Sequence, residues 1–141
     1  MNPFPAWAEP RTAIVTGGGS GIGLAISRRL AAEGAAVAVW DLDGDTAKAT
    51  AALIEEAGGR AVGLAVDVAD RSRIDEAAAE VRAVFGPATI LVNNAGISPF
   101  KRFLDITRED FDRVFAVNMR GTFDCCQAVV PDMIAVVGGA S

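Results

Sequence analysis

A glycine-rich segment is the part of this sequence whose residue types and spacing point most directly to chemistry. Residues 16–23 read Thr-Gly-Gly-Gly-Ser-Gly-Ile-Gly, between a short apolar run at 12–15 and a stretch of helical spacing at 24–30. Glycines allow a tight turn and let the backbone approach a pyrophosphate without Cβ clashes. The free N–H groups that begin the following helix then face the anion. This context favours a nucleotide-binding turn over a flexible linker or a turn without a ligand.

A carboxylate, Asp41, follows the second apolar run. At the end of a second strand it can accept hydrogen bonds from both ribose hydroxyls of a cofactor, and it repels a 2′-phosphate. Neither Ser20 nor Leu42 supplies a cation for such a phosphate. We therefore expect NAD to be preferred over NADP. The alternative is a solvated turn aspartate, with Asp43 and Asp45 nearby.

Polar residues also follow the third and fourth apolar runs. Asp67-Val68 is placed to meet an adenine amino group, unless Asp67 or Asp70 simply caps the next helix. The segment Asn93-Asn94-Ala95-Gly96 is suited to line a cofactor groove, or else forms an Asx-rich turn. The candidate cofactor-binding residues are Gly17, Ser20, Gly21, Ile22, Gly23, Asp41, Asp67, Val68, Asn94, Ala95 and Gly96.

The elements that position these residues alternate between short apolar runs and amphipathic stretches. This alternation predicts a parallel sheet with helices on both faces and right-handed crossovers. With the glycine-rich turn after the first run, it predicts an α/β fold, a doubly wound Rossmann domain. The expected strands lie at 12–15, 36–40, 61–66 and 90–92, and the expected helices at 21–33, 44–57 and 71–85.

A longer helical pattern follows a loop at 94–106. It begins with Thr107 as a candidate N-cap and continues to about residue 135, with Pro131 expected to bend or break it. Residues 136–141 are expected to form a short fifth strand or a frayed end. We expect an irregular N-terminal arm at 1–10 and a single domain at 11–141.

Composition and charge argue against several classes of function. The chain has 141 residues, 51% of them hydrophobic, so it can bury a core and is unlike a disordered chain. A net charge of −5 without a basic block disfavours nucleic acid as a partner, and no apolar run is long enough for a bilayer. Residues 1–10 lack the pattern of a signal peptide. Adjacent Cys125 and Cys126 make a poor bridge, which favours the cytoplasm.

Four motifs occur together in one order: the glycine segment, Asp67-Val68, the segment at 93–96, and Asn118 within Val117-Asn118-Met119-Arg120-Gly121. Over residues 10–135 they strongly resemble the classical short-chain dehydrogenase/reductase family. The resemblance implies a Rossmann domain with strand order 3-2-1-4, which we expect to be incomplete in this chain. It implies that the first three motifs bind the dinucleotide and that Asp41 selects NAD. It also implies that Asn118 is the active-site asparagine that holds a water in a proton relay. Without the resemblance, Asn118 reads as an exposed or capping helix amide.

The sequence departs from the family's pattern in its proton-transfer residues. In the family a catalytic serine follows a fifth strand, and a Tyr-x-x-x-Lys pair supplies the general acid/base and its lysine partner. This sequence has no Tyr and no His, and its only lysines, Lys48 and Lys101, precede Asn118. Residues 136–141 resemble either a damaged fifth strand that ends in Ser141 or the family's last strand. Truncation, internal deletion and a changed reading frame all stay open.

The resemblance implies an NAD-dependent oxidoreductase that transfers hydride between nicotinamide and an alcohol or ketone, as a homo-oligomer. Without the tyrosine and lysine we expect little or no activity from this chain alone. The alternatives are a non-catalytic dinucleotide-binding module and a fragment without a function of its own. We name no metal ligands. We expect Phe115, Val117, Phe123 and Val129 to lie uncovered on the long helix and to favour association.

Overall fold

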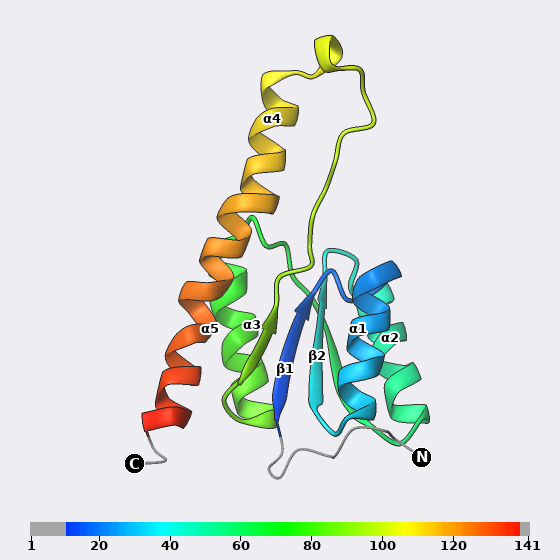
Figure 1. Ribbon diagram of the computed structural model, residues 1–141, viewed down its shortest axis with the longest axis vertical. Helices are drawn as coiled ribbons and strands as arrows, with labels where there is room; N and C mark the ends of the chain where they lie inside the picture. Colours follow the sequence, from blue (N-terminus) through cyan, green and yellow to red (C-terminus); the bar gives the residue numbers. More distant parts are fainter. Residues whose placement is uncertain (1–10, 139–141) are drawn as a thin grey trace.

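Four parallel strands form a sheet of order β3-β2-β1-β4 in the computed structural model, which describes residues 11–138 (Figure 1). The expected strand order and Rossmann architecture are confirmed. The expected N-terminal arm at 1–10 lies outside the described residues. The strands are β1 (Thr12–Thr16), β2 (Ala36–Asp41), β3 (Arg60–Ala65) and β4 (Ile90–Val92).

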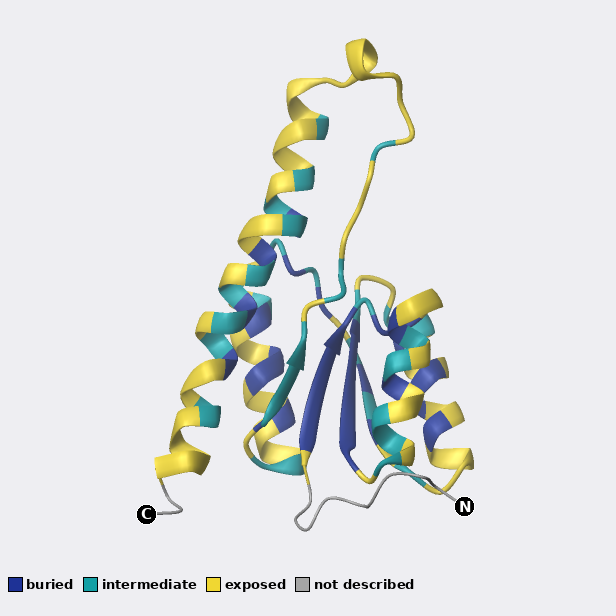
Figure 2. Ribbon diagram, in the orientation of Figure 1, coloured by how far each residue is buried: buried dark blue, intermediate teal, exposed yellow. Residues whose placement is uncertain are grey.

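Helices cover both faces of the sheet. On one face lie α1 (Gly21–Ala32) and α2 (Gly44–Glu56), and on the other lie α3 (Arg71–Phe85) and α5 (Gly121–Gly138) (Figure 1). Successive residues of a strand point to opposite faces, so β2 contributes Trp40 to the core beneath α3 and α5 and Val39 to the core beneath α1 and α2. Double burial explains why β1 and β2 read as continuous apolar runs (Figure 2).

Helix starts follow the capping residues of the sequence. Asp43 caps α2 by accepting from the N–H groups of Asp45 and Thr46, and Asp70 caps α3 by accepting from the N–H of Arg73. Asp70 rather than Asp67 is therefore the cap of α3. The predicted cap at Thr107 is also confirmed, because Thr107 and Asp110 form a reciprocal capping box at the start of α4 (Arg108–Phe115).

The long helical pattern is one continuous rod. A π-helical turn at Ala116–Arg120 joins α4 to α5, and α5 continues through Pro131 without a break. The predicted fifth strand is wrong over residues 136–138, which are helical, and residues 139–141 lie outside the described part. Helix propagation adds one backbone hydrogen bond for each residue that it fixes, so residues 136–138 continue α5.

The two sides of this rod differ in burial. Val117 is 6% exposed and Val129 is 1% exposed, so the expectation that they lie uncovered is wrong. They share a stripe with Gly121 and Cys125, at a spacing of four residues, that packs into the core with α3. Phe115 and Phe123 lie on another side of the rod and are exposed, as expected.

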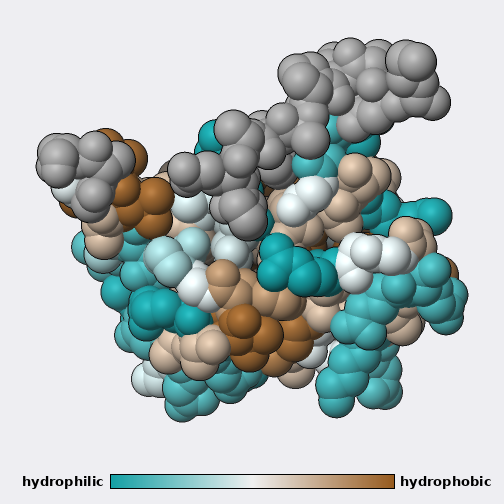
Figure 3. All heavy atoms as spheres, turned by 90° about the horizontal axis from the view of Figure 1, so that it is seen from below, coloured by the Kyte–Doolittle hydropathy of each residue, from teal (hydrophilic) through white to brown (hydrophobic). Residues whose placement is uncertain are grey.

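Residues 97–115, here called the arm, rise beyond the carboxyl ends of the strands (Figure 1). The expected loop contains a 3₁₀ turn at Phe103–Asp105 before it enters α4. Most of the arm is exposed (Figure 2), including Phe100, Phe103 and Leu104. The opposite end of the molecule shows mostly hydrophilic side chains around a small apolar patch (Figure 3).

Candidate functional site

A cleft of about 440 Å³ opens at the carboxyl ends of the parallel strands. This is where open α/β sheets bind ligands, because loops from neighbouring strands meet there. The structure brings together most of the residues predicted from the sequence. Those that line the cleft are Gly17, Ser20, Gly21, Ile22, Asp41, Asp67, Val68, Asn94, Ala95 and Gly96.

The sequence interpretation missed part of the cleft. Its lining also includes Leu42, Val66, Ile97, Arg113 and Val117. The first two are neighbours of predicted residues, and their positions after expected strands are the signal that could have found them. Ile97 likewise follows the predicted residue Gly96, whereas Arg113 and Val117 reach the cleft only because the rod folds back beside the sheet.

The glycine turn is shaped by close packing and by one open position. Gly17 has φ +64°, and a Cβ there would lie 3.0 Å from both the Cα of Ala95 and the Nδ2 of Asn94. A Cβ on Gly23 would overlap the carbonyl of Gly17, so this glycine lets α1 begin directly against the turn. Gly21 has open space around it but adopts φ +53°, which L side chains rarely adopt. Gly23 therefore does not line the cleft and instead supports its wall.

Asp41 is fixed between the glycine turn and the start of α2. Its Oδ2 accepts a hydrogen bond from the N–H of Gly19 at 2.9 Å, and its Oδ1 accepts one from the N–H of Asp43 at 3.1 Å. The second bond is that of an ordinary Asx turn, whereas the bond to Gly19 joins Asp41 to a segment 22 residues away in the sequence. Asp41 also lines the cleft, and its carboxylate can accept further hydrogen bonds beyond these two.

Thr16 connects the ends of β1 and β4 beneath the cleft, a role the sequence interpretation did not identify. Its Oγ1 accepts hydrogen bonds from the N–H groups of Asn94 and Ala95, both at 3.0 Å, and donates to the carbonyl of Val92 at 3.4 Å. The Nδ2 of Asn94 donates to the carbonyl of Gly17 at 3.1 Å. The amide segment therefore braces the glycine turn, consistent with its predicted place in the wall.

Asp67 holds its own loop and contacts the rod. Its Oδ1 accepts from the N–H of Ala69 at 3.0 Å, and its Oδ2 lies 3.5 Å from Nη1 of Arg113. The neighbouring Val68 packs so closely on the rod that a Cβ on Gly121 would lie 2.8 Å from its Cγ2. The third-strand motif thus lies between the sheet and the rod.

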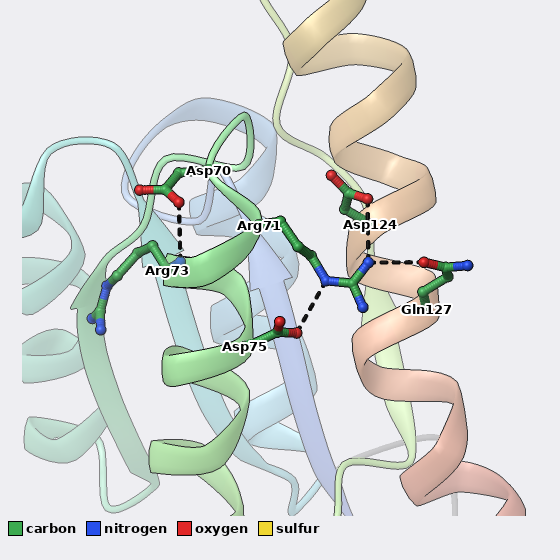
Figure 4. Close-up of polar contacts among 6 residues, drawn as sticks. All are labelled: Asp70, Arg71, Arg73, Asp75, Asp124 and Gln127. Carbon is green, nitrogen blue, oxygen red and sulfur yellow. Dashed lines mark hydrogen bonds and ion pairs between the residues drawn. The ribbon is translucent and has the colours of Figure 1, made fainter.

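A polar cluster fixes the rod against α3 behind this loop (Figure 4). Nη1 of Arg71 donates to Gln127 at 2.8 Å and to Asp124 at 3.3 Å, and its Nε donates to Asp75 at 3.0 Å. The hydrogen bond that Arg71 donates to Asp75 is the main cause that raises the pKa of Arg71. The Arg71 cluster and the packing of Val68 on Gly121 both join the rod to the segment around the start of α3.

Asn118 lies in the π-helical turn and holds the start of the arm. Its Oδ1 accepts from the N–H of Ile97, and its Nδ2 donates to the carbonyl of Ile97, both at 2.9 Å. The Oγ1 of Thr122 donates to its backbone carbonyl at 3.2 Å. Single π turns occur often at functional sites. The side chain of Asn118 is therefore neither free nor a helix cap. Its catalytic role stays a prediction. The other candidate of the sequence, Ser141, lies outside the described residues.

An α/β domain with parallel strands in the order 3-2-1-4, a glycine turn after β1 and a cleft at the strand ends is a Rossmann-type domain. The model of the family described as short chain dehydrogenase matches residues 11–140, and the chain belongs to this family.

Named relatives agree with this assignment. Sorbitol dehydrogenase of Cereibacter sphaeroides is 43% identical over 90% of this chain and 48% of its own length. D-threitol dehydrogenase of Mycolicibacterium smegmatis is 42% identical over 94% of this chain and 51% of its own length. A solved short-chain dehydrogenase/reductase of Serratia marcescens, a double mutant, superposes with a TM-score of 0.82 at 39% identity, covering 87% of this chain and 51% of that one. The chain spans about half the length of the curated relatives it matches.

Proposed function

We propose that this chain binds NAD(H) in the cleft and belongs to an oxidoreductase that transfers hydride between nicotinamide and an alcohol or ketone. The observation that carries the proposal is the fixed Asp41 carboxylate beside a glycine turn in a cleft lined by ten predicted residues. The relatives named for sorbitol and D-threitol support an alcohol as substrate.

The residues that line the cleft are suited to hold a dinucleotide. The N–H groups that open α1 would bind the pyrophosphate, and Asp41 would accept from the ribose hydroxyls. Asp67 and Val68 would contact the adenine, and the segment at 94–96 would line the rest of the cofactor. When bound, the nicotinamide ring supplies or accepts the hydride.

The proton-transfer groups of the family are not matched in this chain, so we propose that it does not reduce carbonyls at a normal rate by itself. The alkoxide left by hydride transfer needs a proton, and general acid catalysis contributes about 10²–10⁴-fold. Lys101 lies on the arm, where its Nζ is 2.7 Å from Asp110 and lowers the pKa of that carboxyl. A non-catalytic dinucleotide-binding module therefore stays the second candidate.

Titration of the folded chain with NADH and NADPH, followed by fluorescence, tests the proposal. We expect saturable binding with NADH preferred. A folded chain that binds neither dinucleotide would overturn the proposal, and a preference for NADPH would overturn the assignment of Asp41. Turnover assays with ketones on a preparation of verified mass test the proposed inactivity of this chain alone, because reduction at a normal rate would overturn it.

Self-association and a reducing compartment are proposed as well. The exposed apolar residues of the arm support association between copies. Cys125 and Cys126 are both free thiols, which supports a cytoplasmic location. Within residues 11–138, no helix combines the length and apolar character needed to cross a membrane.

A further inference from the structure

Two hydrogen bonds hold Gly19, in the middle of the glycine turn, from opposite sides. Its N–H donates to Asp41, and its carbonyl accepts from Oγ1 of Thr50 at 3.3 Å. Thr50 belongs to α2 and is 1% exposed. A Cβ on Gly19 would lie 2.6 Å from Oγ1 of Thr46, so the first turns of α2 pack directly on the glycine turn.

The hydroxyl of Thr50 is not needed for packing in the core. The other buried residues of α2 are Ala47, Ala51 and Ile54, so an apolar side chain would suit this face. A buried hydroxyl in an apolar stripe has a cost unless it forms a hydrogen bond. Here that bond is the one to the carbonyl of Gly19.

This bond sets the direction of the next N–H group. The described residues contain no cis peptide, and in a trans peptide the C=O and the N–H point in opposite directions. The carbonyl of Gly19 points to α2, so the N–H of Ser20 points away from α2. Ser20 lines the cleft and precedes the first turn of α1. Within residues 11–138 no acceptor for this N–H is present.

We infer that Thr50 is a positioning residue, which fixes the Gly19–Ser20 peptide so that the N–H of Ser20 faces the cofactor's pyrophosphate. The inference rests on the proposed function and goes beyond it, because Thr50 does not touch the cleft. Asp41 holds the same glycine by its N–H, so the turn is set in its binding shape before the ligand arrives.

Three variants test this role. Thr50→Val keeps the shape and removes the donor, and Thr50→Ser keeps the donor. Thr12→Val is the matched control, because the buried hydroxyl of Thr12 also donates to a carbonyl, that of Phe85 at 3.1 Å, at the opposite end of the sheet. Each folded variant is titrated with NADH and ADP, which carry phosphates, and with adenosine, which carries none.

We expect Thr50→Val to weaken NADH and ADP binding by about two- to tenfold, the effect of one hydrogen bond, and to leave adenosine binding unchanged. Thr50→Ser and Thr12→Val should bind all three ligands like the wild type. Equal NADH affinity of Thr50→Val and Thr12→Val would overturn the inference, as would an equal loss for adenosine.

Thermal melting of every variant separates a loss of binding from a loss of fold. If Thr50→Val does not fold, Thr50→Ala replaces it. Weaker ADP binding by Thr50→Ala but not by Thr50→Ser then supports the inference, and equal ADP binding by the two overturns it. If the wild type and Thr50→Val bind NADH equally well, this inference is overturned and the proposed function is not. Wild-type chain that binds no dinucleotide removes the proposed function, and the positioning role with it.

Discussion

At the scale of single residues, Asp41 performs two tasks with one carboxylate. It accepts the N–H of Gly19 and, in the proposed complex, the ribose hydroxyls. Asp41→Asn keeps an acceptor for Gly19 and removes the charge that opposes a 2′-phosphate. We expect the ratio of NADPH to NADH dissociation constants to fall by about tenfold, as measured by fluorescence titration.

Asp45→Asn is the control for this measurement. Asp45 is exposed in the first turn of α2, and its substitution removes the same charge as Asp41→Asn does. It should leave the ratio unchanged. An unchanged ratio in Asp41→Asn would show that Asp41 serves the fold and does not select the cofactor.

Cys125 provides a prediction about pH. Burial is the main cause that raises the pKa of its thiol from 9.0 to about 12. The neutral thiol is thus favoured in the folded chain, and this contribution to stability is present below pH 9.0 and is lost as the pH rises through about 12. At pH 8 we expect iodoacetamide to label Cys126 and not Cys125 in the folded chain, as read by mass spectrometry.

Labelling in urea is the control, since both thiols should then react. Equal labelling of Cys125 and Cys126 in the folded chain would contradict the burial of Cys125 within the stripe that packs against α3.

At the scale of elements, the contact between α5 and the loop after β3 depends on Gly121. Replacing a helical glycine by alanine usually stabilises a protein by about 1 kcal/mol. At this position the new Cβ would lie 2.8 Å from Cγ2 of Val68, and overpacking costs about 1–3 kcal/mol. We expect Gly121→Ala to lower the free energy of unfolding, as measured by urea denaturation.

Two further variants check the cause. Gly138→Ala, near the end of the same helix, meets nothing within 4 Å and should not destabilise the chain. Val68→Ala should remove most of the penalty of Gly121→Ala when the two are combined. Destabilisation by Gly121→Ala that Val68→Ala does not relieve would place the strain elsewhere.

At the scale of the whole molecule, the arm and rod carry an exposed apolar surface. Phe111, Phe115, Met119 and Phe123 recur every four residues on the rod and are 49–62% exposed, and the rings of the first two stack at 4.6 Å. Surfaces of this kind drive association. We expect concentration-dependent self-association in light scattering, through contact with a second copy.

Phe103→Ser combined with Leu104→Ser should reduce the association, because both side chains are more than 80% exposed on the arm. Val84→Ser on α3, where Val84 is 62% exposed, is the control and should change little. A monodisperse monomer with a cooperative unfolding transition at high temperature would contradict the expected self-association.

The residues of the cleft were largely predictable because the strand ends and glycine turns are local patterns. Asp41, Asp67 and the segment at 94–96 each follow an apolar run, and parallel strands bring those ends to one edge. The hydrogen bond from Thr50 to Gly19 was not predictable, because Thr50 lies in α2 and its sequence context is that of any core position. The pairing of Asn118 with Ile97 likewise joins residues that only the folded rod brings together.

The sequence by itself determined the βα order and the family, because apolar periodicity, caps and glycine motifs act within a few residues of each other. The strand order was expected from the resemblance to that family, and the pairing of distant strands confirms it. Only the tertiary structure decided which side of the long rod is buried: Val117 and Val129 pack against the core, whereas Phe115 and Phe123 do not. It also decided that residues 136–138 stay helical. Burial depends on where a neighbouring element lies, and a helical repeat alone does not specify that neighbour.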